Sequence, residues 1–396
     1  MGDNSKKPGI RFKGFTDDWE QRKLGELGSL KNGMNFSKKA MGIGFPFVNL
    51  QNIFGNNVID VSNLGKAMAS DSQLKDYNLL NGDVLFVRSS VKLEGVGEAA
   101  LVPQTLDNTT YSGFIIRFRD EYGLDNNFKR FVFGIESVRN QIMSQATNSA
   151  NKNISQSVLE NLELAIPSKS EQQKIGAYFS NLDHLITLHQ RKYDKLVMSK
   201  KSMLEKMFPK NGQTKPEIRF SGFIDDWEQR KVREVTDRYD NLRIPVAASL
   251  RVAGTTPYYG ANGIQDYVDG YTHDGEFILV AEDGANDLKN YPVKCVKGRI
   301  WVNNHAHVLQ GKYDCADNQF LAYAISQADI ESLLVGGGRA KLNAETLMGI
   351  DLLLPNKAEQ IRIGKYLAQL DNLITLHQRK VSSRLFLNKS TIFREN

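Results

Sequence analysis

Apolar positions in the middle of this chain recur at helical spacing, and the same pattern returns near its end. Pro167 precedes the first pattern, where a proline suits the first turn of a helix because its missing N–H has no partner there. The apolar positions then follow one narrow stripe, as in a coiled-coil seam. They are Ile175, Phe179, Leu182, Ile186, Tyr193, Leu196, Met203 and Met207. The pattern predicts a long helix.

Residues 370–380 repeat residues 182–192 with one change, Asn372 in place of His184. Upstream, Pro355, Glu359, Gln360, Ile363 and Gly364 repeat Pro167, Glu171, Gln172, Ile175 and Gly176. A long helix with so narrow a stripe cannot bury it alone, so we expect the other copy to cover it in an antiparallel coiled coil. The seam and assembly residues would be Leu182, Ile186, His189, Leu196, Leu370, Ile374 and His377. The two histidines fit register-setting polar positions, with a metal or pH role as the alternative.

A second duplication pairs residues 10–23 with residues 218–231, which differ at two positions. The order of motif, globular region and long helix therefore occurs twice, which indicates a tandem duplication. The linker at residues 209–216 marks the junction between the halves. The repeated pairs Asp17-Asp18 and Asp225-Asp226 fit a charged turn better than a catalytic carboxylate pair.

The two globular regions, residues 24–166 and 232–354, show no evident sequence similarity to each other, but each mixes strand and helix signals. Short β-branched runs predict strands at residues 83–88, 114–118, 277–281 and 300–302. Helical stretches are expected at residues 127–145 and 318–334. Each region is long enough to bury its own core. The predicted fold class is α/β (mixed α+β), with two globular heads joined by two long antiparallel helices in a pseudo-twofold tandem duplication.

Composition narrows the class of protein only slightly. The 396 residues are 41% hydrophobic and 24% charged, without a membrane-length apolar run, and residues 1–8 lack the apolar core of a signal peptide. Two cysteines, Cys295 and Cys315, fit a reducing cytoplasm. The net charge of +6 suits a polyanionic partner without requiring one.

Catalytic signatures are absent from the sequence: it contains no phosphate-binding loop, no metalloprotease helix motif, no nucleophile elbow and no amino-methyltransferase segment. Cys295, His305, His307 and Cys315 could supply zinc ligands by residue type. Their spacing is unfamiliar and the first half has no counterpart, so we expect no metal site. Residues 301–309 are better interpreted as a strand-to-turn segment that presents polar side chains.

Loops rich in glycine and asparagine carry side chains of the types that contact bases and phosphates. For any single residue a solvated loop is the simpler interpretation, and only the set indicates DNA binding. In the first region the candidates are Arg88, Ser89, Ser90, Lys92, Asn148, Asn151 and Lys152. In the second they are Tyr259, Asn262, Asn286, Asn303, Asn304, His305, Arg339, Lys341 and Asn343.

The two duplicated segments, Ile-Arg-Phe-x-Gly-Phe-x-Asp-Asp-Trp-Glu and the Pro…Glu-Gln…Leu-Asp-x-Leu-Ile-Thr-Leu-His-Gln-Arg-Lys helix, resemble the specificity subunit of type I restriction–modification enzymes across nearly the whole chain. Segments 82–86 and 302–308 resemble parts of its target recognition domains. The resemblance implies a first target recognition domain (residues 1–166), a central conserved helical region with linker (167–215), a second target recognition domain (216–354) and a C-terminal conserved helix (355–396). One departure is that the second helix stops matching the first beyond Lys380.

The same resemblance implies a non-catalytic DNA-reading subunit in a defence against foreign DNA. Each head would read half of a bipartite asymmetric site, and the helices would set the spacing. The implied partners are double-stranded DNA, two modification subunits and two restriction subunits in the cytoplasm, with no membrane. S-adenosylmethionine, ATP and Mg²⁺ would bind those subunits and no cofactor would bind this chain. The alternatives are a stand-alone methyltransferase or nuclease with unrecognised motifs, and a scaffold whose heads bind protein or sugar.

Overall fold

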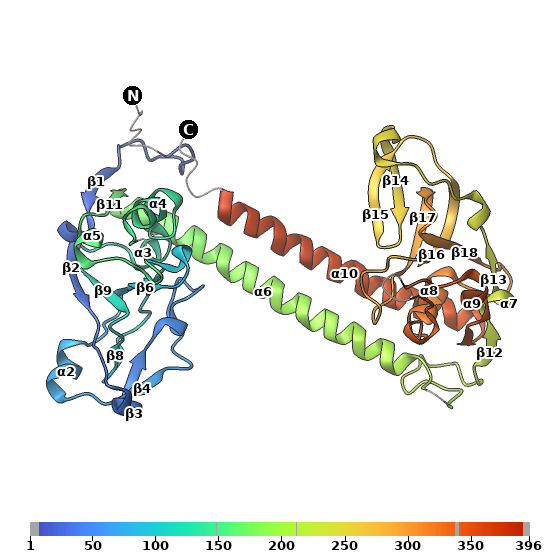
Figure 1. The fold of residues 1–396 in the computed structure, drawn as a ribbon, viewed down its shortest axis with the longest axis horizontal. Helices are drawn as coiled ribbons and strands as arrows, with labels where there is room; N and C mark the ends of the chain where they lie inside the picture. Colours follow the sequence, from blue (N-terminus) through green and yellow to red (C-terminus); the bar gives the residue numbers. More distant parts are fainter. Residues whose placement is uncertain (1–7, 148, 211, 337–339, 391–396) are drawn as a thin grey trace. The chain divides into compact units, whose positions relative to one another are not determined.

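The computed structural model describes residues 8–147, 149–210, 212–336 and 340–390 (Figure 1). The chain divides into two compact units, one of residues up to Leu188 together with those from Lys380 on, the other of His189–Arg379. The long helix α6 (Lys169–Met207) contributes its first half to one unit and its second half to the other. Helix α10 (Lys357–Ser390) begins in the second unit.

The first head is built on a four-stranded sheet and a three-stranded sheet. The four-stranded sheet has the order β2 (Gly28–Asn32), β9 (Ile115–Asp120), β5 (Val84–Val87), β7 (Ala99–Leu101). The three-stranded sheet has the order β4 (Gly65–Ala67), β3 (Met41–Val48), β8 (Thr110–Tyr111). Strand pairs β1 (Glu20–Lys23) with β11 (Glu163–Ile166) and β6 (Ser89–Ser90) with β10 (Lys152–Asn153) complete it. Its helices are α1 (Leu24–Leu27), α2 (Asp71–Asp76), α3 (Asn126–Val132), α4 (Glu136–Gln145) and α5 (Gln156–Glu160).

The second head has one six-stranded sheet. Its order is β13 (Thr236–Arg238), β18 (Ala306–Gly311), β16 (His273–Ala281), β17 (Val293–Val302), β14 (Ala253–Gly260), β15 (Gly263–Val268). Strand β12 (Glu228–Lys231) pairs with β19 (Asp351–Leu354). The head's helices are α7 (Val232–Val235), α8 (Asn318–Ser326) and α9 (Ala344–Gly349).

The two heads share a common arrangement of strand pairings and helix caps, called the frame below, although their sequences differ. Glu20 pairs with Ile166 in the first head, and Glu228 pairs with Leu354 at the equivalent place in the second. A parallel pairing also recurs, β3 with β8 and β14 with β17. Asp125 caps α3 and Asp317 caps α8, each accepting from a backbone N–H three residues on. The predicted mixed α+β class and tandem duplication are therefore confirmed.

The predicted strands are present and the predicted head helices are shorter than expected. The stretch at residues 127–145 is two helices separated at residues 133–135, where Gly134 lowers helix propensity. Helix α8 ends at Ser326, well before the expected end at residue 334.

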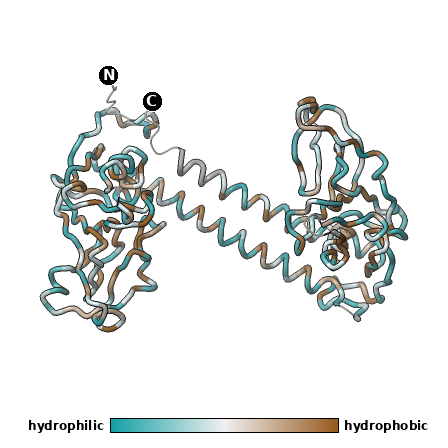
Figure 2. Tube along the Cα trace, viewed as in Figure 1, coloured by the Kyte–Doolittle hydropathy of each residue, from teal (hydrophilic) through white to brown (hydrophobic). Residues whose placement is uncertain are grey.

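The apolar stripes of the long helices are covered largely by the heads. Ile175 and Phe179 of α6 lie in the core of the first head. Met207 at the other end of α6, and Ile363 and Leu367 of α10, lie in the core of the second. Figure 2 shows hydrophobic positions recurring along α6 among hydrophilic ones. This corrects the expectation that the other helix covers the whole stripe, because a head offers each helix end a broader apolar surface than one facing helix does.

Within the second unit α6 and α10 do pair, and they run antiparallel. His189 and His377 lie with their Nδ1 atoms 2.9 Å apart. Lys200 Nζ lies 2.6 Å from Asp371 Oδ1. Lys200 follows His189 on α6 whereas Asp371 precedes His377 on α10, so the two helices run in opposite directions. Among the described residues, no helix is both long and apolar enough to span a membrane.

Candidate nucleic-acid interface

Each repeated motif is fixed to the start of a long helix by the same buried ion pair. Arg11 donates to both carboxylate oxygens of Glu171, at 2.7 and 2.8 Å. Arg219 donates to those of Glu359, at 2.7 Å in both bonds. Glu359 is fully buried, and its hydrogen bonds raise the pKa of Arg219. Bidentate pairing of this kind fixes orientation as well as distance.

A glutamine and a glycine then seat each helix against its head. Gln172 accepts from the Asp125 N–H at 2.9 Å and donates to the Pro167 carbonyl at 3.0 Å. Gln360 makes the equivalent bonds to Asp317 and Pro355. A Cβ added at Gly176 would lie 2.7 Å from the Phe128 backbone nitrogen, so only glycine allows the helix this close. The repeated residues therefore form a common frame.

In the first head the predicted loops meet at the two-stranded ribbon of β6 and β10. Ser89 pairs with Asn153 and Ser90 pairs with Lys152. A cavity of about 570 Å³ lies beside the ribbon. Its lining includes Ser89, Ser90, Lys92 and Asn151, whereas Arg88 donates to the Gly113 carbonyl at 3.3 Å. The candidate Asn148 lies outside the described residues.

In the second head four predicted loops converge. Asp283 forms a β-bridge with Lys341, and Lys341 Nζ lies 2.9 Å from Glu282 Oε1. Asn262 donates to the Gly284 carbonyl and accepts from the Asn286 N–H, each at 2.9 Å.

The remaining candidates of the second head lie at the ends of these loops. Asn304 is exposed in the turn between β17 and β18, and Asn343 is exposed as the residue before α9. Arg339 lies outside the described residues.

Two candidates are buried, which corrects their expected place on the surface. Tyr259 is 7% exposed and lies in a hydrophobic cluster of the second head. Asn303 is 4% exposed, and its Oδ1 accepts from the His305 N–H at 2.8 Å. The Tyr259 side chain therefore packs in the core, and the Asn303 side chain stabilises the turn from inside.

The histidines at the end of this strand have different environments. His305 is partly exposed, with Nδ1 2.5 Å from Asp283 Oδ1. His307 is buried, with Nδ1 2.7 Å from Asp240 and Nε2 2.9 Å from the Leu342 carbonyl oxygen. The prediction that residues 301–309 present polar side chains is therefore wrong for His307.

The four residues weighed as zinc ligands do not come together. Among the described residues, no group of three or more His, Cys, Asp or Glu side chains is placed to hold a metal ion. Burial raises the pKa of Cys295 to about 12, and Cys315 is exposed elsewhere.

The candidate surfaces of the two heads occupy the same place in the shared frame. The Ile154 N–H donates to the Arg88 carbonyl, and the Leu342 N–H donates to the Glu282 carbonyl. In the same way, Arg88 N–H donates to the Phe114 carbonyl and Glu282 N–H to the His305 carbonyl. Phe114 and His305 are thus equivalent. Phe114 is not among the candidates predicted from the sequence. Its equivalence to the candidate His305 becomes visible only in the backbone hydrogen bonds of the two heads.

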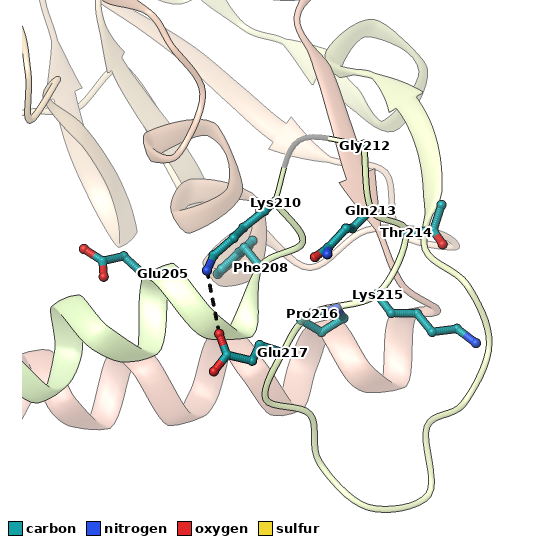
Figure 3. Close-up of a pocket in the computed structure, with 9 residues that line it drawn as sticks. All are labelled: Glu205, Phe208, Lys210, Gly212, Gln213, Thr214, Lys215, Pro216 and Glu217. Carbon is teal, nitrogen blue, oxygen red and sulfur yellow. Dashed lines mark ion pairs between the residues drawn. The ribbon is translucent and has the colours of Figure 1, made fainter.

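The junction between the halves forms a separate cavity of about 540 Å³ (Figure 3). Lys206 and Lys210 lie 3.0 and 3.7 Å from the carboxylate of Glu217. The hydrogen bond from Lys206 lowers the pKa of Glu217. Phe208 stacks on Phe320, with ring centroids 5.4 Å apart. These contacts hold the end of α6 to the residue before the second repeat and to α8 of the second head.

Comparison with known proteins identifies the family. The sequence model of the type I restriction modification DNA specificity domain matches residues 16–198 and again residues 224–384. The chain belongs to this family. Its relatives are specificity subunits of type I restriction–modification systems.

Individual relatives agree with this assignment. A putative type I restriction enzyme specificity subunit of Haemophilus influenzae is 43% identical over 164 residues, which span 41% of this chain and only 42% of that protein. The putative MjaX specificity subunit of Methanocaldococcus jannaschii is 24% identical over 92% of this chain and 90% of its own length. The crystal structure of the S subunit from M. genitalium shares the fold, with a TM-score of 0.64 and 16% identity, covering 98% of this chain and 99% of that one.

Proposed function

We propose that this chain reads a bipartite, asymmetric DNA site, with one half-site for each head. The observation that carries the proposal is the combination of one duplicated frame with two unlike loop surfaces. Symmetric dimers read palindromes because identical surfaces meet both half-sites. Unlike surfaces at equivalent positions would read unlike half-sites. In this proposal, residues 1–166 and 216–354 are the two target recognition domains.

The regions 167–215 and 355–396 would act as the spacing and docking elements. Helix α6 has 39 residues, which corresponds to about 58 Å at 1.5 Å per residue. This length exceeds one DNA turn of about 34 Å. The gap between the half-sites should therefore depend on the helices rather than on the heads.

Repeated surface features support two copies of one partner, which we take to be the modification subunit. Each head has a cavity beside its motif, one lined by Arg11, Asp17 and Lys169 and the other by the equivalent Arg219, Asp225 and Lys357. On the helices, Leu188 and Leu376 occupy equivalent positions and are 46% and 45% exposed. Large exposed apolar side chains that recur in both repeats suit a partner bound twice.

In the complete cytoplasmic complex, restriction subunits would supply cleavage, also in two copies. S-adenosylmethionine would bind the modification subunits, and ATP and Mg²⁺ would bind the restriction subunits.

Base-modification sequencing tests the proposal directly. Deleting the gene should remove one split adenine-methylated motif from the genome, and restoring the gene should return it. If the genome carries no such motif even with the gene present, coexpression of this chain with a modification subunit should produce one. An unchanged methylome after coexpression would contradict the proposed function.

Exchanging one head tests whether each head reads its own half-site. Replacing residues 24–166 with the head of another family member should change one half-site and leave the other half-site and the gap unaltered, because the frame contacts recur in both heads. A matched exchange of residues 232–354 should change the other half-site. A change of both half-sites by either exchange would contradict two independent heads.

A further inference from the structure

Two large apolar side chains of the first head are strongly exposed beside its candidate loops. Val91 is 76% exposed immediately after β6, and Phe114 is 59% exposed immediately before β9. Both line the cavity of about 570 Å³ that also includes Lys92 and Asn151. Leu50 and Phe54 also line this cavity, so its surface is apolar with a few polar groups. Such a hollow is typical of a binding site, because exposed apolar side chains gain free energy when a ligand removes them from water.

Hydrogen bonds and close packing hold this apolar edge in place. Arg88 N–H donates to the Phe114 carbonyl at 2.8 Å, and the Lys92 N–H donates to Ser90 Oγ at 3.2 Å. Arg139 donates to the Glu94 carbonyl at 2.7 Å. A Cβ added at Gly95 would lie 2.5 Å from Ser90 Oγ, so the loop packs as closely as glycine permits. The edge is thus organised before any ligand binds.

The second head carries different chemistry at the equivalent position. His305 corresponds to Phe114, and it pairs with Asp283, which corresponds to Ser89. One head therefore offers an apolar edge where the other offers an ionisable pair. A difference at a shared position of otherwise matching frames is where unlike half-sites would be distinguished.

We infer that Phe114 and Val91 form a specificity-determining contact with the 5-methyl group of a thymine in the major groove. This inference rests on the proposed function. Thymine is the base that presents an apolar group in that groove, and apolar side chains recognise it. Lys92 supplies a cation for the neighbouring phosphates. Glu94 and Glu98 also line the cavity, which disfavours a phosphate inside it and favours a base edge.

The test uses the complex with its modification subunit and a duplex that carries the methylated motif. The exchange of residues 24–166 identifies the half-site that the first head reads. Within that half-site, deoxyuridine, which lacks only the methyl group, replaces each thymine in turn. At one thymine we expect binding to weaken about fourfold, the value for burying one methyl-sized group. In the double variant Phe114→Ala/Val91→Ala, which removes both apolar side chains, the same replacement should have no effect.

The matched control is Met68→Ala, which removes a side chain 50% exposed on the same head but outside the cavity lining. This variant should retain the fourfold sensitivity, and circular dichroism should show that both variants are folded. A half-site without thymine on either strand would overturn the inference and leave the proposed function intact. So would a deoxyuridine effect that persists in the double variant Phe114→Ala/Val91→Ala. Absence of motif-specific binding by the unaltered complex would overturn both the inference and the proposed function.

Discussion

Asp240 joins several parts of the second head through one half-buried carboxylate. It accepts from the Val308 N–H at 2.8 Å and lies 2.7 Å from His307 Nδ1. His307 in turn lies 2.9 Å from the Leu342 carbonyl oxygen, just after Lys341 of the candidate surface. Burial acts to raise the pKa of Asp240, but the bonds from His307 and Val308 and the charge of Arg243 together lower it below 3.8. This network holds a loop of the candidate surface in place.

The lowered pKa predicts how Asp240 contributes to stability as pH changes. The carboxylate should stabilise the folded second unit above pH ~4, and this contribution should be lost as pH falls toward its lower folded-state pKa. Asp240→Asn should cost about 1–3 kcal/mol at pH 7, because the amide has one acceptor oxygen where the carboxylate offers two, one to His307 and one to the Val308 N–H. The unfolding free energy of this variant should also fall less steeply between pH 5 and pH 3 than that of the unaltered chain.

Urea unfolding followed by tryptophan fluorescence measures both effects, and Asp237→Asn on the exposed part of β13 is the control. Equal slopes for the unaltered chain and Asp240→Asn would contradict this role.

Single residues also show where sequence reasoning stops. Residue type selected Lys341 and Asn262, and both contact the loop at residues 283 and 284. The same criterion selected Asn303, although its amide is used inside the turn. Phe114 was not selected, because an apolar side chain before a strand is indistinguishable from a core residue until its exposure is known. Composition identifies polar loops but not the direction in which a side chain points.

The long helices were predictable because their apolar spacing is regular and occurs twice. The partner of each stripe was not predictable, since a stripe of one width fits either a second helix or the edge of a domain. Gly176 and Gly364 carried a usable signal. A repeated glycine inside a helix indicates close packing, here against the backbone of α3 and of α8.

Core packing of the helices predicts that seam substitutions impair folding rather than sequence reading. Leu370 is 9% exposed in the core cluster of the second head, so Leu370→Asp should cost about 4 kcal/mol and lower the melting temperature. Leu182→Asp and Leu196→Asp, at the edges of the head cores, should act in the same direction. The control is Leu373→Asp on the same helix, where the side chain is 42% exposed and the isolated chain should unfold normally. Thermal unfolding measures stability, and methylome sequencing shows the motif that any folded variant reads. A clean change of motif in Leu370→Asp would contradict this assignment.

At the scale of the whole chain, the duplication was the most informative feature of the sequence. It predicted two equivalent halves, and the ion pairs of Arg11 and Arg219 show what the repeated motif does in each. The common architecture of the heads was not predictable, because sheet topology depends on alternating burial that many sequences satisfy. The parts that repeat in sequence form the frame, and the parts that differ form the candidate surface.

Retention of exposed leucines in both repeats leads to a prediction about assembly. Leu185 and Leu188 on α6 are equivalent to Leu373 and Leu376 on α10, and all four are at least 36% exposed. If each pair docks one modification subunit, Leu188→Glu should remove one copy and Leu376→Glu the other, because a charge buried at an apolar contact is strongly unfavourable. Native mass spectrometry of the complex should then show one modification subunit in each single variant and none in the double variant. Met198→Glu, at a side chain 72% exposed on α6 outside the repeated stretch, should retain two. Two copies retained in the double variant would place docking elsewhere, whereas loss of both copies from a single variant would show that the two docking events depend on each other.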